Sequence, residues 1–172
     1  MRQWHRVRLA VNLVNGSTLA GLAVARLGGA RLARCPDGLL AGTGYRLPVP
    51  AAPAFTMGNV VITRRLALDV GSDLFRHEAR HTTQYAWCGG LLMLPLYFAA
   101  AGLSWLLSGD VGAWNVFERG AGLADGGYAV RPLRKVSADP PSETRPRAGR
   151  RCGLGLGRGR GEPGGLIATP YR

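Results

Sequence analysis

Residues 74–87 read LFRHEARHTTQYAW, and this stretch decides both the fold and the chemistry that the sequence predicts. It contains neither proline nor glycine. Residues 69–73 (DVGSD) offer N-cap side chains just before it, and a Gly-Gly pair at 89–90 follows it. These start and stop signals predict a helix over residues 74–87.

Two of the three histidines in the chain, His77 and His81, lie on this predicted helix in the pattern H-E-x-x-H. Residues four apart share one helix face, so both imidazoles can reach one cation at about 2.0–2.1 Å. Glu78 is offset around the helix and can reach a water on that metal, whose pKa zinc lowers towards 7. Glu78 is then the expected general base for attack on a carbonyl. The alternative is a helix with two histidines that bind no metal.

A catalytic zinc ion needs a third protein ligand and an open fourth position. His5 is the remaining histidine, but Glu118 is the better candidate. It follows His81 by 37 residues, beyond one apolar segment, which is enough chain to return antiparallel to the first helix. The alternative is a surface Glu118 paired with a neighbouring arginine. Asp125 is a candidate for orienting a histidine, and Tyr128 for donating a hydrogen bond to an oxyanion.

The sequence upstream of this helix predicts a small β-sheet. Residues 55–63 (FTMGNVVIT) are the best candidate for a strand, and residues 38–49 (GLLAGTGYRLPV) resemble strand material around a Gly-rich turn. Residues 4–27 settle on no period, and polar residues interrupt their faint likeness to a signal peptide. We expect an α+β domain over residues 1–130, with the sheet packed on the helix at 74–87 and on a following apolar helix.

The composition separates this domain from a basic tail. The chain carries a formal net charge of +12, but ten basic and three acidic residues fall in residues 131–172. That segment is rich in Pro, Gly and Arg and poor in large apolar side chains, which predicts disorder. Its short Gly-Arg alternation lacks interleaved aromatic residues, so nucleic acid is not an expected partner beyond non-specific contact with the tail. Three widely spaced cysteines imply neither a disulfide framework nor a cysteine zinc site.

Residues 89–108 carry no charge and are long enough to be considered a transmembrane helix. A span would place His81 and Glu118 on opposite sides of a roughly 30 Å hydrocarbon layer, where they could not share a metal. We therefore expect residues 89–108 to be a buried core helix and the protein to be cytoplasmic. The alternative is a single-span membrane protein without enzymatic activity.

The run over residues 54–84 resembles the small bacterial zincin-like domains that belong with the gluzincin metallopeptidases. Those domains show an Ala-Phe-Thr-x-Gly strand, a short linker and then His-Glu-x-x-His-x-x-Gln. Here the strand begins at Ala54 and the motif ends at Gln84. The later Glu118-Arg119-Gly120-Ala121 is similar to the Glu-x-x-Ala that supplies the third zinc ligand in gluzincins.

The resemblance implies His77, His81 and Glu118 as zinc ligands and Glu78 as general base. It also implies that the strand at 55–63 borders the cleft and pairs with an extended peptide. The implied function is that of a zinc-dependent metallopeptidase, a hydrolase acting on a peptide or protein substrate.

Arg80 and Thr83 depart from the family pattern, which usually has an uncharged residue between the histidines and an apolar one two positions after the second. This departure leaves a catalytically inactive zincin-like binding module as a further alternative. The sequence specifies neither a substrate nor an oligomeric state.

Overall fold

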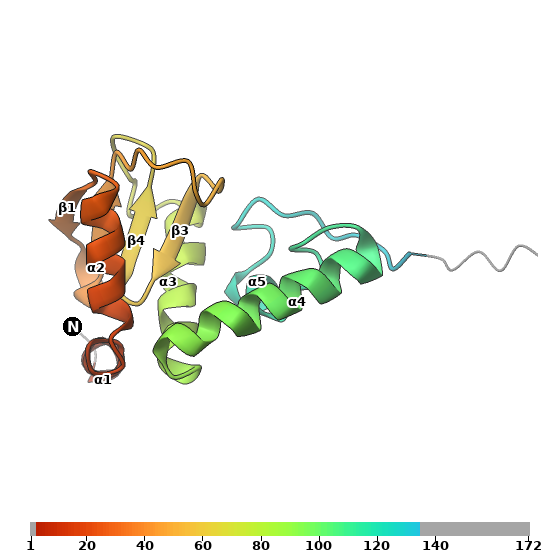
Figure 1. Ribbon diagram of the computed structural model, residues 1–172, viewed down its shortest axis with the longest axis horizontal. Coiled ribbons are helices and arrows are strands. Elements are labelled where there is room, and N and C mark those ends of the chain that lie inside the picture. The colour runs from red at the N-terminus through yellow and green to blue at the C-terminus, as the bar shows by residue number, and fades with distance from the viewer. Residues whose placement is uncertain (1–2, 135–172) are drawn as a thin grey trace, which may run out of the picture. The chain divides into compact units, whose positions relative to one another are not determined.

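The structure, a computed structural model, describes residues 3–134, and these residues form an α+β domain (Figure 1). Within this range there are five α-helices and one four-stranded sheet, so the expected fold class is confirmed at that level. The expected disordered tail at 131–172 lies outside the described residues, apart from its first four.

The sheet is mixed and has the strand order β1-β2-β4-β3. Its strands are β1 (Arg31–Arg34), β2 (Leu40–Thr43), β3 (Ala54–Met57) and β4 (Val60–Thr63). β1 and β2 are antiparallel and are joined by the short 3-10 turn η1 (Pro36–Gly38). β2 pairs in parallel with β4, and β3 pairs with β4 in the antiparallel direction. β3 is therefore an edge strand.

Helices cover both faces of the sheet. The α2 helix (Ser17–Leu27) packs through Ala25 against Val60 and Ile62 on one face. The α3 helix (Asp73–Trp87) packs through Phe75 against Val61 on the other face. Every residue of β4 is buried, because this strand lies between the two helices.

Residues 55–63 form a hairpin, so the prediction of one continuous strand is wrong. β3 and β4 flank a two-residue turn at Gly58 and Asn59, where Gly58 has a φ of 60°. A Cβ on Gly58 would lie 2.3 Å from the backbone nitrogen of Thr18. Glycine at this position therefore lets the turn touch the start of α2.

The first helix, α1 (Gln3–Val14), precedes α2 and was missed because the side chains that it buries are polar. Those side chains are Arg8 and Asn12. Asn12 Nδ2 donates to Asn59 Oδ1 at 2.9 Å and to the carbonyl of Thr82 at 2.8 Å. Hydrogen bonds of this kind attach α1 to the domain without an apolar stripe that a periodic pattern would reveal.

The helix expected over residues 74–87 is confirmed. Its N-cap is Ser72, whose hydroxyl accepts a hydrogen bond from the backbone nitrogen of Phe75, and Gly89 follows it with a φ of 73°. The 3-10 turn η2 (Gly90–Leu92) then leads into α4 (Met93–Ser108), and α5 (Val116–Ala121) follows.

The expectation that residues 89–108 form a buried core helix is wrong. In α4 only Met93 and Ser104 are buried, and in the apolar segment Gly90–Ser108 the buried share is 17%. Of the described helices, this segment is the single unbent one that is long and apolar enough to cross a membrane. Its apolar composition predicted burial, but the domain covers only one side of the helix (Figure 1).

Candidate metal centre

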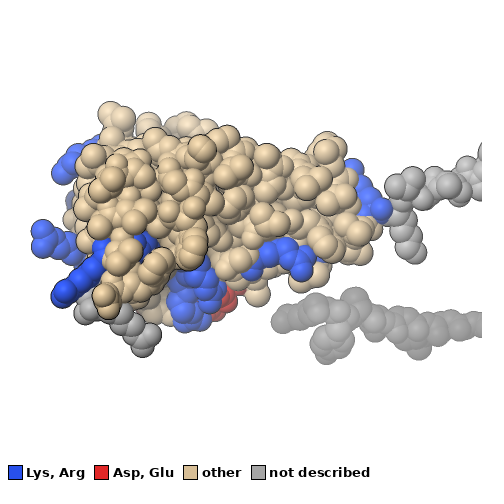
Figure 2. Space-filling view, turned by 90° about the horizontal axis from the view of Figure 1, so that it is seen from below, with Lys and Arg blue, Asp and Glu red and all other residues tan. Residues whose placement is uncertain are grey.

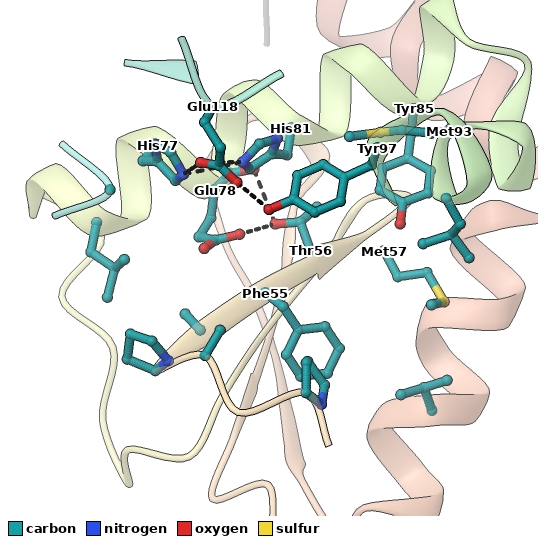
Figure 3. A pocket seen from close by; sticks show the side chains of 18 of the residues that line it. Phe55, Thr56, Met57, His77, Glu78, His81, Tyr85, Met93, Tyr97 and Glu118 are labelled. Atoms are coloured by element: carbon teal, nitrogen blue, oxygen red, sulfur yellow. Dashed lines mark hydrogen bonds and ion pairs between the residues drawn. The ribbon is translucent and has the colours of Figure 1, made fainter. Parts of the chain in front are cut away.

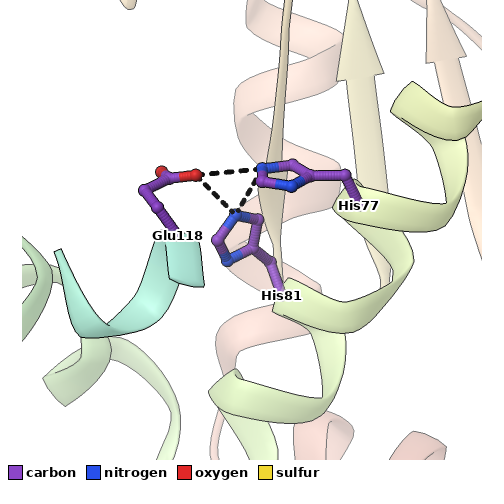
Figure 4. A group of neighbouring side chains, drawn as sticks. All are labelled: His77, His81 and Glu118. Carbon is purple, nitrogen blue, oxygen red and sulfur yellow. Dashed lines mark hydrogen bonds and ion pairs between the residues drawn. The ribbon is translucent and has the colours of Figure 1, made fainter. Parts of the chain in front are cut away.

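Two helices bring together the three residues that the sequence singled out as ligands. His77 and His81 lie one turn apart on α3, and Glu118 lies on α5, whose N-cap is Asn115. The Nε2 atoms of the two histidines are 3.1 Å apart. Glu118 Oε2 lies 3.0 Å from His77 Nε2 and 3.7 Å from His81 Nε2 (Figure 4). All three side chains are buried, and their ligand atoms lie within 4.8 Å of one another, as a shared metal ion requires.

Hydrogen bonds on the far side of each imidazole determine which nitrogen faces this group. His77 Nδ1 lies 3.0 Å from the carbonyl oxygen of Gly122, which can only accept, so this nitrogen carries a proton. His81 Nδ1 lies 2.7 Å from Gln84 Oε1. The Gln84 amide is oriented by its Nε2, which donates to the carbonyl of Phe117 at 2.8 Å. In the neutral imidazoles, both Nε2 lone pairs therefore point at Glu118 Oε2.

The negative charge and the lone pairs of His77, His81 and Glu118 favour binding of a cation. Glu118 Oε2 is buried and receives no hydrogen bond, whereas its other oxygen accepts one from the hydroxyl of Tyr97. Two imidazole lone pairs and a carboxylate oxygen converge in a site with little access to water. Such an arrangement is costly unless a proton or a metal ion lies between the three atoms. The residues present thus fit a metal ion with nitrogen and oxygen ligands.

The pKa shifts agree with this description. Burial by itself would raise the pKa of Glu118, but the adjacent imidazoles of His77 and His81 and the hydroxyl of Tyr97 lower it to about 2. Burial by itself would lower the pKa of His77, but Glu118 and the carbonyl of Gly122 raise it instead. Without a metal, the carboxylate therefore stays ionised and favours a proton on His77, which a metal would displace.

Glu78 is placed beside the ligand group but does not belong to it. It is buried, and its carboxylate points from α3 towards β3 (Figure 3). Thr56 Oγ1 donates to Glu78 Oε2 at 2.7 Å. Burial raises the pKa of Glu78, while the Thr56 hydroxyl and the two histidines oppose that rise. The carboxyl group is therefore held next to the candidate ligands in one orientation and with a raised pKa, an arrangement that is compatible with a general base.

The site opens into a cleft of about 430 Å³ that is mostly apolar. The edge strand β3 forms one wall, and α3 and the beginning of α4 form others (Figure 3). Its apolar lining includes Phe55, Met57, Tyr85, Met93 and Phe98. Gly126 borders it too, because a Cβ on that residue would lie 2.4 Å from His77 Cε1. The cleft therefore has room for an apolar chain next to the ligand group.

Arg80, which departs from the family pattern, has a structural role here. Its guanidinium donates to the carbonyl of Ala121 at 2.6 Å and to Asp125 Oδ2 at 2.5 Å. Both partners follow Glu118 in the chain, so Arg80 holds the segment that carries Glu118 against α3. Asp125 therefore binds Arg80, and the prediction that it orients a histidine is wrong.

The structure also places the remaining candidate residues and adds others that the sequence did not indicate. His5, the other candidate ligand, is on α1, and its Nδ1 lies 2.6 Å from Asp37, away from the ligand group. Gln84 and the carbonyl of Gly122 orient the histidines. The role of Tyr97 was missed, although it is the one phenol in α4, and its hydroxyl donates to Glu118. Tyr128 lines the cleft, with its ring centroid 6.3 Å from that of His77.

Comparisons with protein-family models, with curated proteins and with solved structures find no match to this chain. The likeness to gluzincins therefore depends on the motif residues and on where the fold places them.

Proposed function

We propose that this chain is a zinc-dependent metallopeptidase of the zincin-like, gluzincin type, with His77, His81 and Glu118 as the metal ligands. The observation that carries the proposal is the convergence of both Nε2 atoms with a buried carboxylate oxygen that receives no hydrogen bond. Two imidazoles and one carboxylate are a ligand set that catalytic zinc sites use, because it leaves a fourth position open.

Zinc bound to this set would act as a Lewis acid, polarising the scissile carbonyl and lowering the pKa of water towards 7. Glu78 takes the proton of the attacking water as the new C–O bond forms. It then passes this proton to the leaving amine as the C–N bond breaks. Tyr128, at the cleft wall, is the candidate donor to the carbonyl oxygen as its negative charge develops.

The cleft indicates the class of substrate. β3 is the edge strand of the sheet, so its free side is available for backbone pairing with an extended peptide. The neighbouring side chains, among them Phe55, Met57 and Phe98, are apolar. Peptides with apolar side chains near the scissile bond are therefore the expected substrates.

The test combines elemental analysis with hydrolysis of a fluorogenic peptide library by the full chain and by the Glu78→Gln variant. We expect about one zinc ion per chain in both proteins, and cleavage by the wild type alone. Zinc without cleavage in the wild type would identify an inactive binding module. A folded protein that binds no zinc would overturn the metal assignment itself.

A further inference from the structure

The outward side of α4 is apolar throughout. Between His81 and Asp110 the chain has no charged residue. The exposed side of α4 carries Leu96, Leu103, Trp105 and Leu106, and Phe98 lies between this side and the cleft. A helix of a water-soluble domain normally has polar side chains on its exposed side. The exposed side of α4 has no charged or amide side chains, so it is better suited to an apolar environment than to water.

A second helix shows the same inversion. The side chains that α1 buries are the polar Arg8 and Asn12, while all its large apolar residues except the half-buried Leu9 are exposed. The exposed ones are Trp4, Val7, Val11, Leu13 and Val14. Val14 is 91% exposed. Two helices of one domain therefore direct apolar side chains outward.

These two surfaces are continuous. The rings of Trp4 on α1 and Trp87 at the end of α3 lie 6.0 Å apart, and Trp87 is 76% exposed. The end of α1 also approaches the turn before α4, because a Cβ on Gly90 would lie 2.6 Å from Asn15 Cγ. Figure 2 shows a broad area without charged side chains along the domain, with arginines mainly at its borders.

Tryptophan and arginine lie together at the far end of α4. The Arg134 guanidinium lies 5.6 Å from the ring centre of Trp105, and that of Arg119 lies 4.9 Å from the ring centre of Trp114. Tryptophan prefers the boundary between hydrocarbon and water, and arginine beside it can bind a lipid phosphate. The full chain also carries a net charge of +12, which favours an anionic surface.

We propose that this apolar face, formed by α1, Trp87 and the outward side of α4, docks on an anionic lipid bilayer. The helices lie in the plane of the membrane and bury their apolar side chains at the boundary between headgroups and acyl chains. A second copy of the chain fits less well, because the face offers no polar pairs to set a register and both copies would carry the same positive charge.

The geometry favours a helix lying in the membrane plane over a spanning one. The apolar segment Gly90–Ser108 would extend about 29 Å at ~1.5 Å per residue, close to the roughly 30 Å of a hydrocarbon core, so the contacts of the chain that follows it decide between the two arrangements. The chain also returns along α4. Ser104 Oγ accepts from the backbone nitrogen of Trp114, and Tyr97 donates to Glu118. A span would carry this polar return segment into hydrocarbon, where its ionised groups are costly.

The docking inference stands without the proposed function. Leu94 and Phe98 of α4 also line the cleft, so docking would bring the cleft close to the lipid surface. Docking could in this way bring a membrane-bound substrate to Glu78, and this consequence rests on the proposed function.

Vesicle flotation of the full chain tests the proposal. The vesicles are phosphatidylcholine with and without phosphatidylglycerol, at low and high salt. We expect flotation with the anionic vesicles, part of which survives high salt because apolar burial is not screened. The double variant Leu103→Gln/Leu106→Gln should bind at least tenfold more weakly. The matched control Leu27→Gln/Leu66→Gln changes two exposed leucines at the end of α2 and after β4 and should float as the wild type does.

Three outcomes would overturn the inference. Equal flotation of both double variants, or complete release by salt, would show that charge alone drives binding. A wild type that dimerises in sedimentation without floating, together with a monomeric Leu103→Gln/Leu106→Gln variant, would make the face a contact between copies. Circular dichroism verifies that each variant is folded, and quenching of tryptophan fluorescence by brominated lipid gives an independent measure of insertion.

Discussion

His77 Nε2 and Glu118 Oε2 lie 3.0 Å apart, although they belong to two helices separated by the whole of α4. This contact depends on the return of the chain along α4, on the N-cap at Asn115 and on the clamp between Arg80 and Asp125. Each of these features can be changed separately, so the contribution of each to the metal centre is open to measurement.

Replacing Glu118 with Gln should weaken zinc binding about 100-fold or more, because outer hydrogen-bonding partners of metal ligands already contribute 10–100-fold. The substitution keeps the size of the side chain and its bond from Tyr97 but removes the charge. Competition with a chromophoric chelator measures the affinity. Asp69→Asn, at an exposed acid before α3, is the control and should leave zinc affinity unchanged. Equal zinc affinity of the Glu118 variant and the wild type would exclude Glu118 as a ligand.

Glu78→Gln should retain zinc and lose activity by about 10²–10⁴-fold in kcat, the range expected for a lost general base. The amide still accepts the hydrogen bond of Thr56 but cannot take a proton from water. Zinc content and steady-state kinetics on the same preparation separate the two roles. Loss of zinc in step with loss of activity would instead assign Glu78 to the ligand set.

The hydroxyl of Thr56 should set the pH range of activity. It donates to the Glu78 carboxylate, so it favours the ionised form and opposes the rise in pKa that burial causes. Thr56→Val therefore raises the pKa of Glu78 further. Because the base must be ionised, the acid limb of kcat/KM should move to higher pH while zinc content stays constant. If the acid limb of kcat/KM stays at the same pH, the ionisation of Glu78 does not control the rate.

Arg80 should support the metal site from outside. Arg80→Met removes the bonds to the carbonyl of Ala121 and to Asp125, so the segment that carries Glu118 loses its attachment to α3. We expect zinc affinity to fall by about tenfold, as for other supporting partners of metal ligands. Arg76→Met is the matched control, because Arg76 lies on the same helix and, among residues 3–134, forms its bonds with the exposed Asp73 and Gly71. Equal zinc affinities of the two variants would show that Arg80 does not support the metal site.

The convergence of His77, His81 and Glu118 was predictable where local sequence signals agree with one another. The α3 helix has a Ser cap, an uninterrupted interior and a glycine stop, and its two histidines share a face at a spacing that any α-helix enforces. Glu118 was reachable from its distance along the chain and from the resemblance. The contacts of Gln84 with His81 and of Tyr97 with Glu118 depend on how α3, α4 and α5 pack together. The spacing of residues in the sequence does not specify this packing.

The periphery of the fold was harder to predict for a different reason. Pattern analysis assumes that apolar residues face inward. In α1 the inward residues are Arg8 and Asn12, and in α4 the apolar residues face outward, so both helices break that assumption. The hairpin at Gly58 was missed because its turn interrupts a run that is otherwise typical of one strand.

Gly58 should be essential to the stability of the domain, and Gly89 offers a matched comparison. Both residues have positive φ angles, 60° and 73°, so alanine at either position costs about 1–2 kcal/mol from backbone strain. At Gly89 nothing lies within 4 Å of an added Cβ, and strain is the whole cost. At Gly58 the Cβ would also meet the backbone of Thr18 at 2.3 Å, which forces α2 away from the hairpin. We expect Gly58→Ala to lower the free energy of unfolding by about 2–5 kcal/mol, the backbone strain plus about 1–3 kcal/mol for overpacking, as measured by urea denaturation of both variants. Equal losses in the two variants would mean that α2 and the hairpin do not depend on this close approach.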